Sequence, residues 1–100
     1  MKKIISNNQI DKYILLFLEK SLTEKNLTLS SIEAYKNDLN DFYKHLTRNK
    51  IQVLTCQYEH IVSWIDLLKN KSFEHTTLAR KISTLRQFFN FLFAEKFIKI

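Results

Sequence analysis

Apolar residues recur at intervals of three and four along most of this chain, the spacing that places side chains on one face of an α-helix. The clearest case runs from about Leu29 to Arg48. Its predicted inward-facing residues are Ile32, Tyr35, Leu39, Phe42 and Leu46. Thr28 or Ser30 would cap this helix at its start. Ser30 and Glu33 also have the spacing of a capping box.

Three further segments show the same helical spacing, at about 8–21, 57–70 and 76–96, and Thr55 is the expected cap of the second of these. Their predicted inward-facing residues are Ile10, Ile14, Phe17 and Leu18 in the first, Ile61, Trp64, Ile65 and Leu68 in the second, and Leu78, Ile82, Leu85, Phe89 and Leu92 in the last. The sequence therefore predicts four helices joined by polar loops.

The helices at 29–48 and 76–96 resemble each other at an offset of 46 residues. Residues 30–32 (SSI) align with residues 76–78 (TTL). The aligned apolar positions are Leu39, Phe42, Tyr43 and Leu46 with Leu85, Phe88, Phe89 and Leu92. Two similar helical hairpins would produce this similarity, and so would two ordinary amphipathic helices. The period occurs only twice, so a solenoid is excluded.

The composition agrees with a single all-α domain over residues 1–100. Hydrophobic residues make up 45% of the 100 residues, enough for a core, and the sequence has no glycine and no proline. Glycine-rich phosphate loops and nucleophile elbows are therefore excluded, and tight β-hairpins lose their preferred turn residues.

Cys56 is the single cysteine, which excludes an intramolecular disulfide and fits a reducing, cytoplasmic setting. The first residues, MKKIISNN, lack the apolar run of a signal peptide. The longest apolar run, YILLFL at 13–18, is too short to cross a bilayer, so we expect no membrane association.

The formal charge of +6 and the isoelectric point near 9.5 favour an acidic partner, with nucleic acid first and an anionic membrane surface second. A helical wheel places Arg80 in the middle of the outward face of the last helix, with Lys81 and Arg86 at the borders of its apolar stripe. No acidic residue lies between Glu74 and Glu95. The rest of this outward face consists of Thr76, Ser83, Thr84, Gln87 and Asn90.

The helix at 29–48 also separates its charges on the wheel. Asp38, Asp41 and His45 lie along one side of its predicted exposed face. Basic and amide residues lie along the other, namely Lys36, Asn37, Asn40, Lys44 and Arg48. Cations bind phosphates or guanine, and amides can bind adenine, so both helices suit a DNA groove. Charged helix faces are also common on proteins that bind nothing acidic, and Arg86 could simply lay its stem over the core.

No residue pattern predicts catalysis, a metal or a cofactor. His45, His60 and His75 lack the spacing of zinc ligands, and Cys56 has no basic neighbour that would activate it. Asp38 and Asp41 could form a carboxylate pair, but an exposed helix surface is a poor place to shift a pKa. Tyr35 and Trp64 are expected to pack in the core.

Two long motifs resemble those of tyrosine recombinases, the family of phage integrases and Xer-type chromosome-resolving enzymes. The first is EKNLTLSSIEAYKNDLNDFYKHL, residues 24–46, which resembles the family pattern Leu-Ser-x-x-Thr-x-x-x-Tyr-x-x-Asp-Leu-x-x-Phe. Its matching positions are Leu27, Thr28, Ser31, Tyr35, Asp38, Leu39 and Phe42.

The second motif is LARKISTLRQFFNFLFAEKF, residues 78–97, which resembles Ala-Arg-x-Leu-Ser-x-x-Arg-x-Phe. Its matching positions are Ala79, Arg80, Ile82, Ser83, Arg86 and Phe88. The resemblance covers nearly the whole chain.

The resemblance implies a core-binding, or SAM-like, domain: four or five helices in two crossed hairpins that form half of a clamp around a recombination half-site. The second and fourth helices would approach the major groove of double-stranded DNA. The resemblance predicts DNA contacts for Ser31, Lys36, Arg80 and Arg86. The helix faces extend this set to Asn40, Lys44, Thr76, Thr77, Lys81, Thr84 and Gln87.

The sequence departs from the family pattern in three places. Asn26 stands where the family usually has glycine, and asparagine can also adopt the left-handed conformation. Ser72, Phe73 and Glu74 replace Gly-Leu-Ser before the second motif, with the acid of Glu74 near a helix N-terminus. Asn37 stands where the family often has arginine, which weakens one phosphate contact.

The family's chemistry needs a tyrosine nucleophile and its helper residues in a second domain, which residues 1–100 do not contain. We therefore expect this chain to bind DNA without cutting it, and to be monomeric by itself. Other recombinase protomers are the partners expected of the full-length protein. Two alternatives stay open at this point: a helical protein-interaction module whose basic surface is incidental, and a helix-turn-helix regulator, for which the loops look too long.

Overall fold

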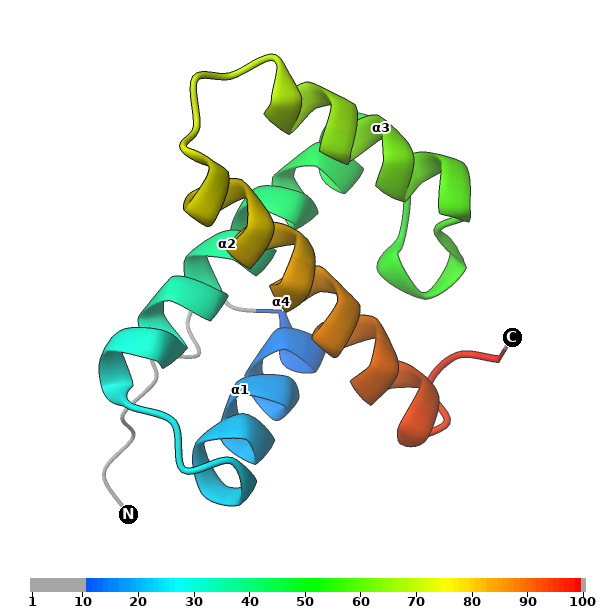
Figure 1. The fold of residues 1–100 in the computed structure, drawn as a ribbon. Coiled ribbons are helices and arrows are strands. Elements are labelled where there is room, and N and C mark those ends of the chain that lie inside the picture. The colour runs from blue at the N-terminus through cyan, green and yellow to red at the C-terminus, as the bar shows by residue number, and fades with distance from the viewer. Residues whose placement is uncertain (1–10, 100) are drawn as a thin grey trace.

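The computed structural model describes residues 11–99, which contain four α-helices and one short 3₁₀ helix and no β-strand (Figure 1). The elements are α1 (Lys12–Glu24), α2 (Leu29–Arg48), η1 (Val53–Thr55), α3 (Tyr58–Lys69) and α4 (His75–Ala94). The predicted all-α fold is confirmed. The first helix begins later and ends later than predicted, and the predicted core position of Ile10 lies outside the described residues.

Side chains before each helix explain where three of the helices begin. Asp11 caps α1 by accepting a hydrogen bond of 2.8 Å from the backbone N–H of Tyr13. Thr28 caps α2, so the other candidate cap and its capping box are wrong, because Ser30 lies inside the helix. Thr55 is not the cap of α3. Gln57 takes that place, and its N–H donates to Nδ1 of His60 at 2.7 Å.

Within residues 11–99, three residues adopt the left-handed conformation that glycine most readily takes. Asn26 has a φ of 53°, which agrees with its place at the family's usual glycine. Lys50 and Lys96 have φ of 57° and 64° and follow the ends of α2 and α4. At both ends a Schellman motif closes the helix, with 2.9 Å bonds from the N–H of the next residue to the carbonyls of Leu46 and Leu92.

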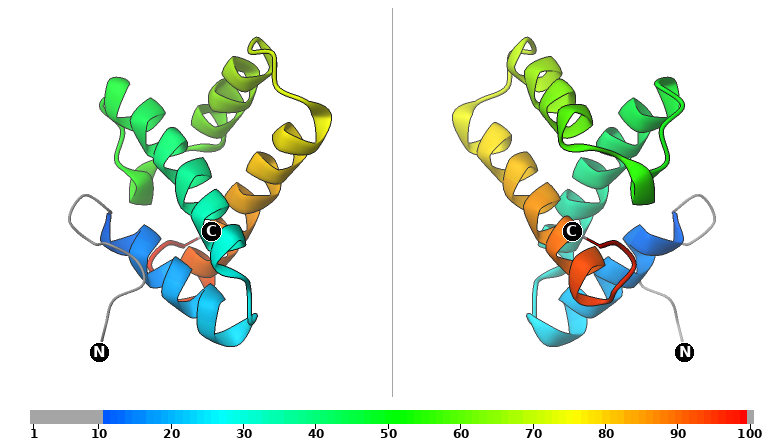
Figure 2. Two further views of the ribbon diagram at one scale, coloured as in Figure 1. Left: turned by 90° about the vertical axis from the view of Figure 1, so that its left-hand side faces the viewer. Right: turned by 90° about the vertical axis from the view of Figure 1, so that its right-hand side faces the viewer.

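The helices form two crossed hairpins, α1 with α2 and α3 with α4, as the resemblance implies. α2 and α4 contact each other directly, and Figure 2 (left) shows them as the two arms of a V that cross near its lower end. The connection between α1 and α2 has only four residues, 25–28, shorter than predicted. The core is formed by buried apolar residues of all four helices and η1: Ile14, Phe17, Leu18, Ile32, Leu39, Phe42, Leu46, Val53, Trp64, Leu68, Leu85, Phe88 and Leu92.

α2 and α4 bury the same positions at the offset of 46 residues. The apolar pairs buried in both helices are Leu39 with Leu85, Phe42 with Phe88 and Leu46 with Leu92. The two helices therefore use a common register.

The predicted inward stripe of α4 is partly wrong. Phe88 is fully buried, whereas Leu78, Ile82 and Phe89 are only half-buried. The centre of the buried side is therefore rotated by roughly 80° from the predicted stripe, at 100° per residue. α4 packs against three other helices, so its buried arc is wide and the apolar residues alone do not mark its centre.

Candidate nucleic-acid interface

Asp38, in the middle of α2, is the centre of a charged cluster at the crossing with α4. Its carboxylate accepts two hydrogen bonds from Arg80, from Nε at 3.0 Å and from Nη2 at 2.8 Å. Nζ of Lys81 donates at 3.1 Å, and the Thr84 hydroxyl donates at 3.0 Å. Lys81 also pairs with Asp41 of α2 at 3.1 Å. We call these five residues the Asp38 clasp.

Most of the clasp is inaccessible to solvent. Asp38 is 1% exposed, Thr84 is fully buried, and the side chain of Lys81 is 6% exposed. The side chain of Arg80 is 42% exposed, so its guanidinium lies at the edge of the cluster. Its hydrogen bonds to Asp38 raise the pKa of the Arg80 guanidinium above its already high value. Two carboxylates face two cations, and the charges of the clasp cancel.

Several predictions about these residues are wrong. Arg80 does not project from the middle of an outward face, because two of its nitrogens bind a buried carboxylate. Thr84 was placed outward and is fully buried, and Lys81 lies inside rather than at a border. Asp38 is not on an exposed surface. The common reason is the rotation of α4, which turns 81, 84 and 88 toward α2.

One signal in the sequence pointed to this arrangement. The offset of 46 residues aligns Asp38 with Thr84, and these two side chains are hydrogen-bonded to each other. Applying the predicted inward positions of α2 to α4 at this offset would have placed Lys81 and Phe88 on the inner side. A buried aspartate is rare unless it is paired, which is why the apolar stripe alone missed it.

The other predicted contact residues lie in different surroundings. Arg86, Lys44 and Thr76 are exposed, and Arg86 now lies near the middle of the outward side of α4, where Arg80 was expected. Lys36 is half-buried and pairs with Glu33 at 2.9 Å. The half-buried residues without such a pair are Ser31, whose hydroxyl accepts a hydrogen bond from Thr28, together with Asn40 and Thr77.

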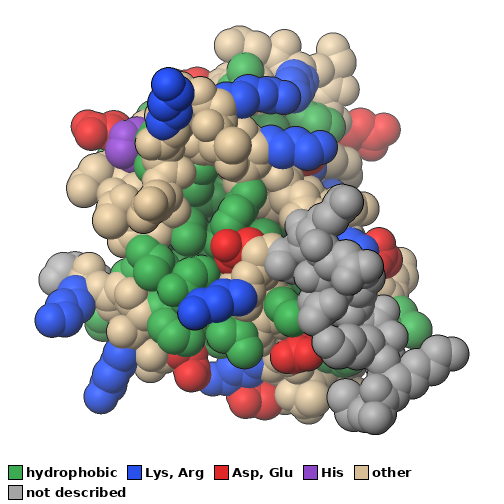
Figure 3. Space-filling model, turned by 180° about the vertical axis from the view of Figure 1, so that it is seen from behind, with side chains coloured by type: hydrophobic (Ala, Val, Ile, Leu, Met, Phe, Trp, Pro, Cys, Tyr) green, Lys and Arg blue, Asp and Glu red, His purple; other side chains and the backbone are tan. Residues whose placement is uncertain are grey.

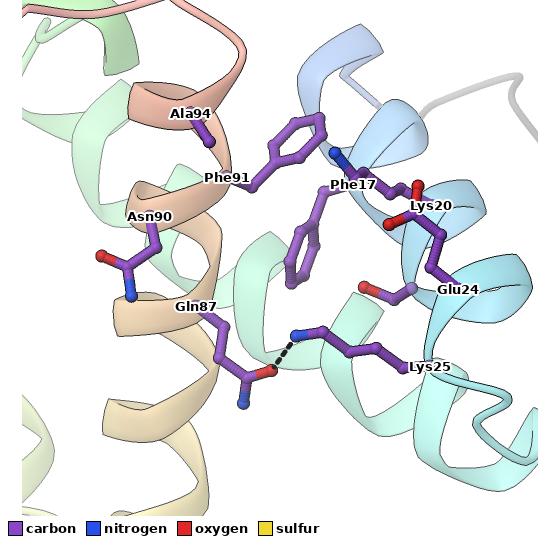
Figure 4. Close-up of a pocket in the computed structure, with 9 residues that line it drawn as sticks. Phe17, Lys20, Glu24, Lys25, Gln87, Asn90, Phe91 and Ala94 are labelled. Carbon is purple, nitrogen blue, oxygen red and sulfur yellow. Dashed lines mark hydrogen bonds between the residues drawn. The ribbon is translucent and has the colours of Figure 1, made fainter.

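Gln87 is drawn toward α1 rather than outward. Its Oε1 accepts a hydrogen bond of 2.9 Å from Nζ of Lys25, and Figure 4 shows the two side chains reaching toward each other at the rim of a pocket between α1 and α4. The pocket has a volume of about 230 Å³ and is lined by Phe17 and Phe91. Lys20 at its edge pairs with Glu95 at 2.7 Å, so charges of both signs surround it.

The charges left without a partner on α2 and α4 are positive. Lys44, Arg48 and Arg86 are exposed and make no ion pair with any residue of 11–99. Every carboxylate of α2 is paired with a cation, and α4 contains none. From the side opposite α4, the surface carries both cations and acids around apolar side chains (Figure 3).

The sequence of residues 14–96 matches the family model described as phage integrase, N-terminal SAM-like domain. The chain belongs to this family. The resemblance to tyrosine recombinases is thereby confirmed, and with it the SAM-like, all-α fold of the domain.

Curated relatives carry the same assignment. The chain is 36% identical to tyrosine recombinase XerD of Rickettsia bellii over 84 residues, which cover 84% of the chain and 28% of the relative. It is 39% identical to tyrosine recombinase XerC of Listeria monocytogenes over 83 residues, covering 82% and 28%. XerC of Thermodesulfovibrio yellowstonii is 40% identical over 88 residues, covering 88% and 28%. The chain thus spans just over a quarter of the length of these family members. No solved structure matches it.

No helix within 11–99 is long and apolar enough to cross a membrane. In the same part of the chain, no three histidine, cysteine, aspartate or glutamate residues are grouped as metal ligands would be. Burial raises the pKa of the half-buried Cys56 thiol, the opposite of what activates a nucleophile.

Proposed function

We propose that this domain binds double-stranded DNA through the outer sides of α2 and α4, as the N-terminal part of a tyrosine recombinase. The observation that carries the proposal is the distribution of charge on these two helices. Their carboxylates are neutralised by neighbouring cations, while Lys44, Arg48 and Arg86 have no partner among residues 11–99. The unbalanced charge that the two helices present is therefore positive.

The mechanism is docking on the phosphate backbone by these cations. Hydroxyl and amide side chains on the same helices add contacts to sugars and base edges, and the exposed ones are Ser30, Asn37, Thr76 and Asn90. α2 and α4 cross in contact with each other, so we expect one duplex to reach both (Figure 2). The catalytic steps of strand exchange, and the contacts with other protomers, belong to the rest of the recombinase.

A salt titration of DNA binding tests the proposal. The logarithm of the association constant falls linearly with the logarithm of the salt concentration, with a slope of about −0.9 for each phosphate that the protein neutralises. We expect a slope of a few units for the unsubstituted domain. Lys44→Ala and Arg86→Ala should each weaken binding and reduce the slope by about one unit.

Lys12→Ala is the matched control, because it removes the same charge from an exposed position on α1. If Lys12→Ala weakens binding as much as the two substitutions on α2 and α4, the interface is placed on the wrong helices. No binding at low salt, or binding that does not respond to salt, would instead favour a protein-interaction module.

A further inference from the structure

The Asp38 clasp lies where the two proposed DNA-binding helices cross. Its three donors, Arg80, Lys81 and Thr84, come from slightly more than one turn of α4, and all three bind the same carboxylate of α2. We propose that Asp38 is a positioning residue for DNA binding, which holds α4 at one rotation against α2. This inference rests on the proposed function. It assigns to Asp38 the spacing between the side chains of α2 and α4 that contact DNA.

Directional bonds give the clasp a property that the apolar core lacks. Leu and Phe side chains pack well over a range of helix rotations, and helix crossing angles scatter by about 15–20° within one packing class. Arg80 and Lys81 lie about 100° apart around α4, with Thr84 between them, and all three bind one carboxylate, so turning or sliding the helix breaks at least one bond. The register of Arg86 relative to Lys44 is thereby tied to Asp38.

The Asp38 clasp contributes little electrostatic attraction for DNA. Its two carboxylates offset its two cations, and Thr84 is fully buried and out of reach of a ligand. A buried ion pair is often no more stabilising than apolar residues of the same volume, so stability alone explains it weakly. Holding the helices in one relative position is the contribution that remains.

Removing the charge of Asp38 distinguishes two roles, because a positioning role and simple electrostatic attraction predict opposite changes in DNA affinity. Asp38→Asn removes a negative charge from between the two proposed DNA-binding helices, and attraction alone would make the variant bind DNA more tightly. Positioning predicts weaker binding, by about tenfold. Glu33→Gln is the matched control on the same helix, because Glu33 is exposed and lies outside the clasp. This control should bind DNA slightly more tightly than the unsubstituted domain.

Thr84→Val gives a second measurement if Asp38→Asn does not fold. Thr84 cannot contact DNA, so a change in affinity must act through the packing of α2 and α4. We expect Thr84→Val to weaken binding severalfold with an unchanged salt slope, because the number of neutralised phosphates stays the same. Thr84→Ser keeps the hydroxyl and should restore most of the affinity.

All affinities are measured at a temperature at which circular dichroism shows each variant to be folded. Unchanged or tighter binding by Thr84→Val or by a folded Asp38→Asn would overturn the positioning role, while the unsubstituted domain still bound DNA. A salt slope that falls by about one unit in Thr84→Val would also overturn it. Absence of binding by the unsubstituted domain is a different result, and it rejects the proposed function itself.

Discussion

Removing the carboxylate of Asp38 should destabilise the domain more than removing any cation bonded to it. Asp38→Ala breaks four hydrogen bonds of 2.8–3.1 Å at once. It leaves the Thr84 hydroxyl and the Lys81 ammonium buried. Breaking a buried ion pair in this way typically costs 3–5 kcal/mol.

The surroundings of each donor place the expected loss at the lower end of that range. Lys81 keeps its bond to Asp41, and the guanidinium of Arg80 is already 42% exposed and can turn to water. We expect Asp38→Ala to lower the free energy of unfolding by about 3 kcal/mol. Arg80→Ala leaves Asp38 bonded to Lys81 and Thr84, and should cost about 1–2 kcal/mol.

Urea unfolding followed by far-ultraviolet circular dichroism measures these losses, and a domain with about 5–15 kcal/mol of stability stays folded through them. Arg86→Ala is the control, an exposed arginine of the same helix that should change stability by less than about 0.5 kcal/mol. The rotation of α4 would be refuted if Arg80→Ala left the free energy of unfolding unchanged while Arg86→Ala lowered it. Arg80 would then have the solvent-facing position that the helical wheel predicts.

Two further predictions concern backbone strain and pH. Lys50→Gly and Lys96→Gly should each raise the free energy of unfolding by about 0.5–1 kcal/mol, because the left-handed conformation is costly for lysine and free for glycine. Lys44→Gly, inside α2, should lower the free energy of unfolding by about 1 kcal/mol in the same urea titration. A lower free energy of unfolding in all three glycine variants would contradict the left-handed strain at Lys50 and Lys96. Burial lowers the pKa of His45 below its ordinary value of 6.5, so the unfolded chain takes up this proton first. The melting temperature should therefore be highest above pH 6.5 and fall as the pH drops from there through the folded-state pKa. His45→Gln should flatten this fall, and an equally steep fall in the variant would assign it to another group.

The sequence by itself determined the number of helices, their approximate bounds and most of the core. Spacings of three and four report which residues share a helix face, and α2 was predicted with the bounds that the structure has. The buried Trp64 also followed from its apolar stripe, and the left-handed Asn26 followed from the resemblance, because the family usually has glycine at that position. The two motifs pointed correctly to the recombinase family.

The tertiary structure alone decided which side of α4 faces inward and what its two arginines do. A helical wheel assumes that polar residues face water, and Asp38 breaks that assumption because donors from another helix satisfy its charge. Those donors lie more than 40 residues away along the chain, so no local pattern links them to Asp38. Arg80 thus joins α4 to α2 through the Asp38 carboxylate, and Arg86 is the arginine on the outward side of α4.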